Sequence, residues 1–95
     1  MNKAEQRHVD KVAATGCCVC RKFHGLKIAS EVHHIAIGSG KRSHFATVSL
    51  CPEHHRNGPD SFHGGGSRKF LMRYKLPSEY HLLIIQNEFM AIDNL

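Results

Sequence analysis

The apolar positions of this 95-residue chain predict helices at both ends and strands between them. Residues 2–15 carry apolar side chains on one helical stripe and charged side chains on the opposite side. Asn2, followed three residues later by Glu5, is typical of a capping box at a helix start. Gly16 fits the C-terminal stop of that helix. We therefore predict a helix over residues 2–15.

Two β-branched runs follow, one within residues 26–37 and the other over residues 45–50. A basic stretch with glycine and serine, residues 38–44, lies between them. The pattern predicts two strands joined by a basic loop, which either contacts phosphates or is simply solvated.

Helical spacing returns in the last third of the chain. Residues 67–74 predict a basic amphipathic helix, and residues 78–92 predict a last helix with Ser78 as its N-cap. The last helix is apolar on more than one side. Core packing explains most of this apolar surface, and a dimer contact would explain the remainder. We find no repeat or linker, so residues 1–95 are interpreted as one small α+β domain.

Composition and charge narrow the picture. The chain is 41% hydrophobic but has no Trp, so its core is modest, and chains of this size often add a metal or disulfides. No apolar stretch is typical of a signal peptide or a membrane helix, so we expect a cytoplasmic protein with no membrane partner. In that reducing compartment the four cysteines favour metal binding over disulfides. A net charge of +5 indicates an anionic partner, nucleic acid before membrane.

The cysteines have the spacing of a zinc knuckle. Cys17 and Cys20 form one Cys-x2-Cys pair, and Cys51 with His54 supplies a second half-site about thirty residues later. Together they predict a closed, structural zinc site. Cys18 is interpreted as a small buried hydrophobe, although pairing of Cys18 with Cys20, or all three thiolates on one metal, stays open.

Four further histidines have no role in such a knuckle: His33, His34, His55 and His63. Because side chains in a strand alternate faces, His33 and His34 point to opposite sides unless the strand ends there. That geometry suits one histidine as a metal ligand and its neighbour as a group facing a reacting atom. A non-catalytic zinc-binding adaptor for DNA or protein is the alternative, and these extra histidines argue against it.

The motifs Cys-x2-Cys, Val-His-His-Ile and Leu-Cys-x2-His-His, followed by a further histidine, resemble the HNH family of ββα-metal nucleases over residues 17 to about 76. Residues 33–64 are most similar to the phage recombination-enhancement nucleases, which depend on RecA. The resemblance implies a ββα-metal core with a zinc knuckle, flanked by an N-terminal helix and two C-terminal helices. It also implies an endonuclease that hydrolyses DNA phosphodiesters.

The resemblance assigns roles by motif. His34 matches the general base, and His33, His55 and His63 match the ligands of a catalytic divalent cation. The family's central Asn is absent, and His44 is expected to substitute for it by bonding to a backbone carbonyl. A histidine in place of the usual first Asp ligand favours Mn²⁺, Zn²⁺, Ni²⁺ or Co²⁺ over Mg²⁺. His54 and His55 could exchange roles between the two metals.

The expected DNA contacts are basic side chains that would bind backbone phosphates: Lys41, Arg42, Arg68, Lys69 and Arg73. None of them implies base readout, so we expect little sequence specificity. The resemblance adds a RecA-like recombinase filament as an expected partner, with the chain a monomer or homodimer. If the protein is encoded by a phage, the compartment is the cytoplasm of the bacterial host.

Overall fold

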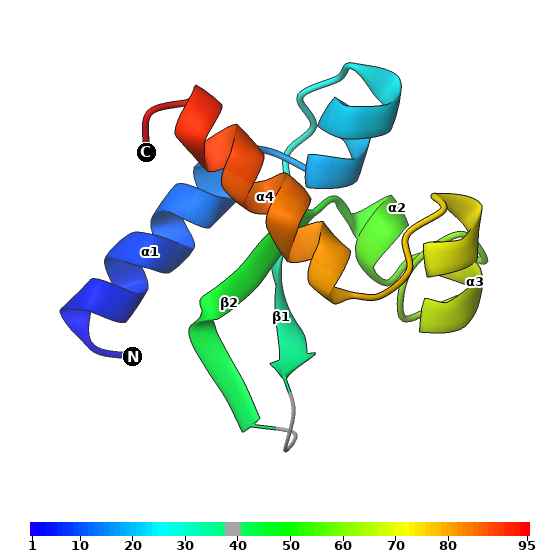
Figure 1. Ribbon diagram of the computed structural model, residues 1–95, viewed down its shortest axis with the longest axis horizontal. Helices are drawn as coiled ribbons and strands as arrows, with labels where there is room; N and C mark the ends of the chain where they lie inside the picture. The colour runs from blue at the N-terminus through cyan, green and yellow to red at the C-terminus, as the bar shows by residue number, and fades with distance from the viewer. Residues whose placement is uncertain (38–40) are drawn as a thin grey trace.

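The fold is built around a hairpin of two antiparallel strands, β1 (Glu31–Ile37) and β2 (Lys41–Leu50) (Figure 1). The computed structural model describes residues 1–37 and 41–95, so residues 38–40 of the expected loop lie outside the described residues. The first strand begins five residues later than predicted, because its partner β2 ends at Leu50, opposite Glu31. The second strand begins four residues earlier than predicted, since the basic residues 41–44 continue the pairing.

The register of the hairpin is irregular between His34 and Ala36. His34 pairs with Thr47, whereas Ala36 pairs with Arg42. Such an irregularity locally re-aims the side chains on both sides of it. It lies beside the two adjacent histidines of the predicted site.

Helix α1 (Lys3–Ala14) begins and ends as predicted. The Asn2 side chain accepts a hydrogen bond from the backbone N–H of Glu5 at 2.8 Å, and the Glu5 carboxylate accepts one from the N–H of Asn2 at 2.9 Å. Gly16 follows the helix with φ of +73°, a conformation that favours glycine. The capping box and the glycine stop are therefore confirmed.

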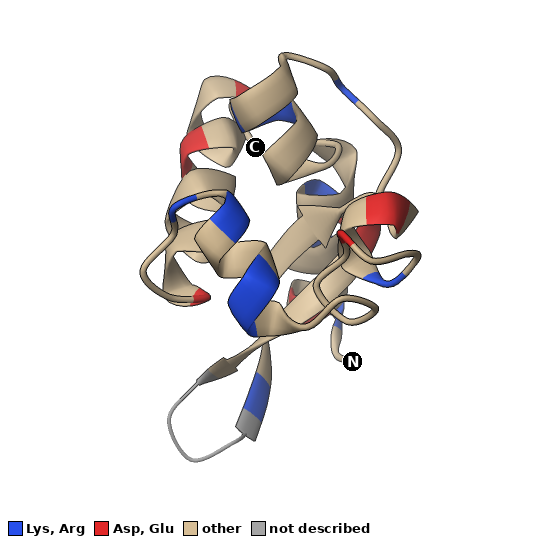
Figure 2. Cartoon of the chain, turned by 90° about the vertical axis from the view of Figure 1, so that its right-hand side faces the viewer, with Lys and Arg blue, Asp and Glu red and all other residues tan. Residues whose placement is uncertain are grey.

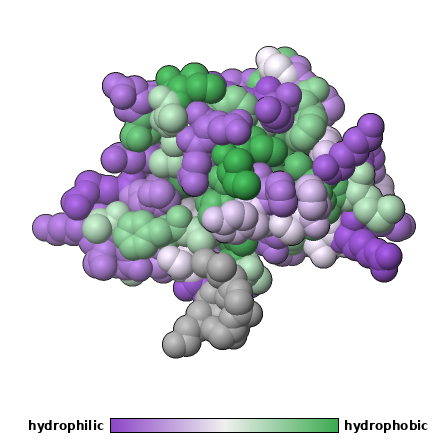
Figure 3. Space-filling model, in the orientation of Figure 1, coloured by the Kyte–Doolittle hydropathy of each residue, from purple (hydrophilic) through white to green (hydrophobic). Residues whose placement is uncertain are grey.

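Helix α4 (Tyr80–Ile92) crosses the hairpin and contacts both β2 and α1 (Figure 1). Ser78 is not its N-cap, so that prediction is wrong. The cap is Glu79, and the Ser78 hydroxyl pairs instead with the ring Nδ1 of His81 at 3.0 Å. Figure 3 shows apolar side chains on the outer side of α4, where Ile84 and Ile92 are exposed.

A buried amide ties these elements together. Gln86 of α4 is fully buried; its side chain accepts a hydrogen bond from the N–H of Ser49 at 3.0 Å and donates one to Thr15 Oγ1 at 2.9 Å. The surrounding core takes apolar side chains from the hairpin, the knuckle and the C-terminal helices, among them Val19, Ile35, Val48, Leu50, Phe62, Phe70 and Leu82.

Three short helices complete the fold: η1 (Cys20–His24), α2 (Pro52–His55) and α3 (Ser67–Arg73). They lie on the side of the hairpin away from α1 (Figure 1). The α+β class is as predicted, with α1 ahead of the hairpin and α3 and α4 towards the C-terminus; the short η1 also precedes the hairpin. Within the described residues, no helix combines the length and the apolar character needed to cross a bilayer.

Candidate metal centres and active site

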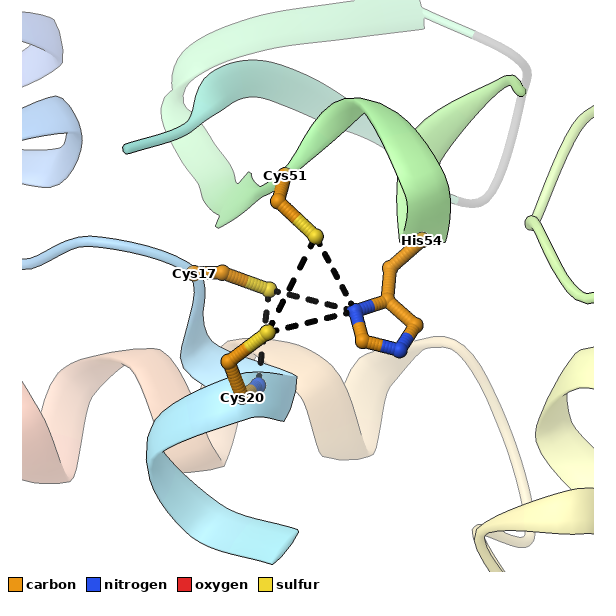
Figure 4. Close-up of side chains that lie close together, drawn as sticks. All are labelled: Cys17, Cys20, Cys51 and His54. Carbon is orange, nitrogen blue, oxygen red and sulfur yellow. Dashed lines mark hydrogen bonds between the residues drawn. The ribbon is translucent and has the colours of Figure 1, made fainter. Parts of the chain in front are cut away.

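The structure brings Cys17, Cys20, Cys51 and His54 together, with one donor atom from each within 4.8 Å of all the others (Figure 4). The Sγ atoms of Cys20 and Cys51 are 3.8 Å apart, and His54 Nδ1 lies 3.1 to 3.6 Å from the three sulfurs. Four ligands held at about 2.0–2.3 Å in a tetrahedron are separated by roughly 3.5–3.8 Å. Both the donor set and the spacing therefore fit a tetrahedral zinc ion.

Local backbone structure sets this spacing. Cys17 donates its N–H to Ile28 O at 2.9 Å, and Leu26 donates to Cys20 O at 3.1 Å, which closes the first half-site into a loop. In the second half-site Cys51 is the N-cap of α2, and His54 donates its N–H to the carbonyl oxygen of Cys51 at 3.0 Å.

Of the three thiols in this cluster, Cys17 has a lowered pKa, whereas Cys20 and Cys51 have raised pKa values. Burial raises the pKa of Cys17, but hydrogen bonds from His54 and from the backbone outweigh it and bring the pKa to about 7. Burial and the charge of Cys17 raise the pKa of Cys20. A divalent cation would relieve this repulsion, because thiolates are its ligands.

Two neighbours complete the knuckle. Cys18 is fully buried and stands outside the cluster, in agreement with its interpretation as a hydrophobe, and burial raises the pKa of its thiol. Tyr74 was not predicted; its hydroxyl pairs with His54 Nε2 at 3.0 Å. The tyrosine thereby fixes the ring nitrogen that His54 does not turn towards the sulfurs.

The second cluster contains His33 of β1, His55 of α2 and His63, with one nitrogen from each within 4.8 Å of the others. Their ring centroids are 4.9 to 5.2 Å apart. Three imidazoles that share an ion at about 2.0–2.1 Å from each nitrogen place their rings about 5 Å apart. The donor set therefore fits a divalent cation of the borderline class, with positions left for other ligands.

Backbone contacts bring His63 beside His55. Phe62 donates its N–H to His54 O, and His63 donates to His55 O, each at 2.8 Å. The turn after His63 needs glycine, because a β-carbon on Gly65 would overlap the carbonyl oxygen of Pro59. In this arrangement His54 and His55 serve different clusters.

Two carboxylates that were not predicted bond to the histidine cluster. Glu79 Oε1 lies 2.9 Å from His33 Nε2, and Glu31 Oε1 lies 3.0 Å from His55 Nδ1. Burial, followed by the charges of the other histidines, lowers the pKa of His33 to about 3, so the imidazole is neutral. Burial raises the pKa of Glu79, against the opposing effect of the Ala36 amide. A neutral imidazole is the form that binds metals.

His34 contacts a different side chain from the one that His33 contacts. Its Nε2 lies 2.9 Å from His44 Nδ1 on β2, and the two rings meet edge to face. The structure pairs His44 with the ring of His34, and the expected bond from His44 to a backbone carbonyl stays a prediction. Burial, followed by the charges of His44 and Arg42, lowers the pKa of His34.

Four of these five histidines, all but His44, border one depression of about 190 Å³; its lining is Val32, His33, His34, Arg42, His55, Arg56 and His63. Arg42 was predicted as a phosphate contact, whereas Arg56 was missed although it directly follows the His-His pair. Burial, followed by the charges of His55 and Arg56, lowers the pKa of His63. The depression is thus lined by imidazole nitrogens and two guanidinium groups.

The other predicted phosphate contacts lie elsewhere. Arg68 and Lys69 are exposed on α3, and Arg73 of the same helix pairs with Asp60 at 2.5 Å. Lys69 and Arg73 border a separate depression of about 270 Å³. The side chain of Lys41 lies outside the described residues.

The fold and its two clusters define a small α+β protein whose Cys/His and trihistidine groups could each hold a metal ion. A family model described as "Recombination enhancement, RecA-dependent nuclease" matches residues 2–91, and the chain belongs to this family. The family name gives a nuclease that acts in recombination. Comparison with curated proteins and with solved structures finds no match.

Proposed function

We propose that the protein is a metal-dependent DNA endonuclease of the HNH type that hydrolyses phosphodiester bonds during recombination, with a RecA-like filament as partner. The observation that carries the proposal is the depression where the trihistidine cluster, His34 and two arginines meet. A structural zinc site alone would need none of these groups. Their convergence provides ligands, a base and phosphate contacts in one place.

A divalent cation held by His33, His55 and His63 would supply Lewis-acid polarisation of the phosphate and neutralise charge on the leaving oxygen. Zn²⁺, Mn²⁺, Co²⁺ and Ni²⁺ suit the nitrogen donors best, ahead of Mg²⁺. The Cys17, Cys20, Cys51 and His54 cluster would hold the structural zinc with four protein ligands, which leaves no ligand position open.

His34 is the general base. A neutral imidazole has one N–H, so His34 accepts a proton from water at Nδ1 only if its Nε2–H donates to His44 Nδ1. In that arrangement His44 orients the ring of His34 and fixes its tautomer. The lowered pKa of His34 keeps the base neutral near pH 7.

Phosphate binding falls to basic side chains around the depression and on α3. Arg42 and Arg56 border the depression and can each contact a phosphate oxygen. Figure 2 shows further basic positions on α3, where Arg68 and Lys69 are exposed. These groups recognise charge and shape instead of base edges, so sequence specificity is low.

The deciding experiment is cleavage of single- and double-stranded DNA with added Mn²⁺, Co²⁺, Ni²⁺ or Mg²⁺, with and without a recombinase filament. His34→Ala should slow cleavage about 10²–10⁴-fold while zinc content and DNA affinity persist. His33→Ala should instead weaken the response to added metal. His8→Ala, which changes a histidine outside both clusters, should cut at the wild-type rate.

Failure of the wild-type protein to cut any of these substrates with any of these metals would refute the nuclease proposal. If the wild type cuts and His34→Ala cuts equally well, His34 is not the base, and His44 is the next residue to test.

A further inference from the structure

We infer that Glu79 is a positioning residue of the trihistidine cluster: its carboxylate holds His33 in the tautomer and orientation that turn Nδ1 towards a bound cation. The inference rests on the proposed function, since it concerns the same cation site. It adds a residue from the C-terminal part of the chain, which the HNH resemblance does not cover.

The hydrogen bond fixes the tautomer of His33. Glu79 Oε1 lies 2.9 Å from His33 Nε2, and an ionised carboxylate can only accept. The proton of His33 must therefore be on Nε2, which leaves the lone pair on Nδ1. Carboxylates that bond in this way to a metal-binding histidine orient the ring and raise its basicity.

The ring has little freedom to adopt another arrangement. His33 is 3% exposed, and its ring packs against Phe62 with centroids 4.6 Å apart. Rotation of the ring would bury an N–H without a partner, at a cost of about 1–3 kcal/mol. Glu79 accepts a hydrogen bond from that N–H and so selects one of the two orientations of the His33 ring.

Helix α4 holds the carboxylate in place. Glu79 is the cap residue of α4, and Leu82 and Gln86 in the next two turns are fully buried. The start of the helix cannot shift without moving this buried face. The C-terminal helix therefore does more than cover the hairpin: it supplies an anchored group to a site on β1, 46 residues away in sequence.

Glu79 acts through His33 and is not itself a ligand. The donor atoms that lie within 4.8 Å of one another come from the three histidines, and the Glu79 carboxylate is not among them. Glu31 bonds to His55 Nδ1 in the same manner, but its side chain is 41% exposed and is shared with Arg56 at 3.5 Å. Glu79, at 22% exposed, is the more enclosed of the two carboxylates.

The first test is calorimetric titration of Mn²⁺ or Co²⁺ into protein whose knuckle is already loaded with zinc. Glu79→Gln keeps the size of the side chain but removes its charge, and should weaken cation binding about 10- to 100-fold. Glu88→Gln is the matched control, because it makes the same change at an exposed position of the same helix. In a His33→Ala background, Glu79→Gln should cause no further loss of affinity.

The second test reads the tautomer directly and needs no bound cation. Long-range ¹H–¹⁵N spectra of the His33 ring should show the proton on Nε2 in the wild type and a mixture of tautomers in Glu79→Ala. This readout distinguishes positioning from a purely structural role, which would leave the tautomer unchanged.

Each outcome decides the inference. Wild-type cation affinity in Glu79→Gln, a further loss in the His33→Ala background, or an Nδ1–H tautomer in the wild type would overturn it. If wild-type protein binds no second cation, the proposed catalytic site fails, while the tautomer spectra still judge the role of Glu79 separately.

Discussion

Cys20→Ser should release the bound zinc and unfold the protein at 25 °C. Cys20 contributes one of three sulfurs to a cluster whose four residues come from two distant half-sites, and four of the core residues are cysteines in or beside that cluster. Structural zinc contributes about 10–16 kcal/mol of binding free energy in zinc-finger peptides. That is of the same order as the whole free energy of unfolding of a small domain, about 5–15 kcal/mol. A serine hydroxyl is a poor substitute for the thiolate, so a large part of this energy is lost.

Cys18→Ser is the matched control, because it is the same chemical change two residues away, at a fully buried position outside the cluster. Burial of the hydroxyl costs about 1–3 kcal/mol, which lowers Tm by roughly 4–8 °C for each kcal/mol. Zinc per chain is measured by elemental analysis, and folding by circular dichroism. The reasoning is refuted if Cys18→Ser loses zinc while Cys20→Ser keeps one zinc per chain and melts like the wild type.

Two further predictions test the core and the phosphate contacts. Gln86→Leu should lower the free energy of unfolding, measured by urea denaturation, by roughly 2–4 kcal/mol, because it leaves the buried N–H of Ser49 without a partner. The control Asn87→Ala, at an exposed position, should change the free energy of unfolding by less than about 0.5 kcal/mol. Each phosphate contact contributes about −0.9 to the slope of log K against log salt concentration for duplex binding. Arg56→Ala should therefore make this slope less negative by about one unit. An unchanged slope would exclude Arg56 as a phosphate contact.

The sequence predicted best where the signal is local. The capping box at Asn2 and Glu5 needs only residues three apart, and Gly16 marks the helix stop by its backbone preference. The Cys-x2-Cys and Cys-x2-His half-sites are likewise short-range patterns, and the structure brings them together. In these cases the chemistry of neighbouring residues nearly determines the geometry.

Prediction failed where the outcome depends on the partner. The second strand starts earlier than predicted because its basic residues pair with the end of β1, and composition does not reveal this pairing. Ser78 has the side chain of a helix cap, but it pairs with His81 instead.

The missed site residues follow the same rule. Glu31 stands two positions before His33 on one strand, so their alternation could have suggested a shared face. Glu79 gave no such signal, because only the docking of α4 brings it to His33.

The acid limb of the pH–rate profile should lie below pH 6.5, the ordinary pKa of histidine. Burial and the charges of His44 and Arg42 lower the pKa of His34, so the base stays neutral at a pH where a free histidine is protonated. Cleavage should therefore persist as the pH falls through 6.5 and disappear only below it. His44→Ala removes the charge of His44 but leaves burial, which is the larger cause of the lowered His34 pKa. The acid limb of the pH–rate profile should therefore move towards pH 6.5 without reaching it. Ring resonances of His34, followed by NMR during a pH titration, separate this effect from protonation of the metal ligands. A His34 midpoint at or above 6.5 in the wild type would show that the depression does not favour the neutral base.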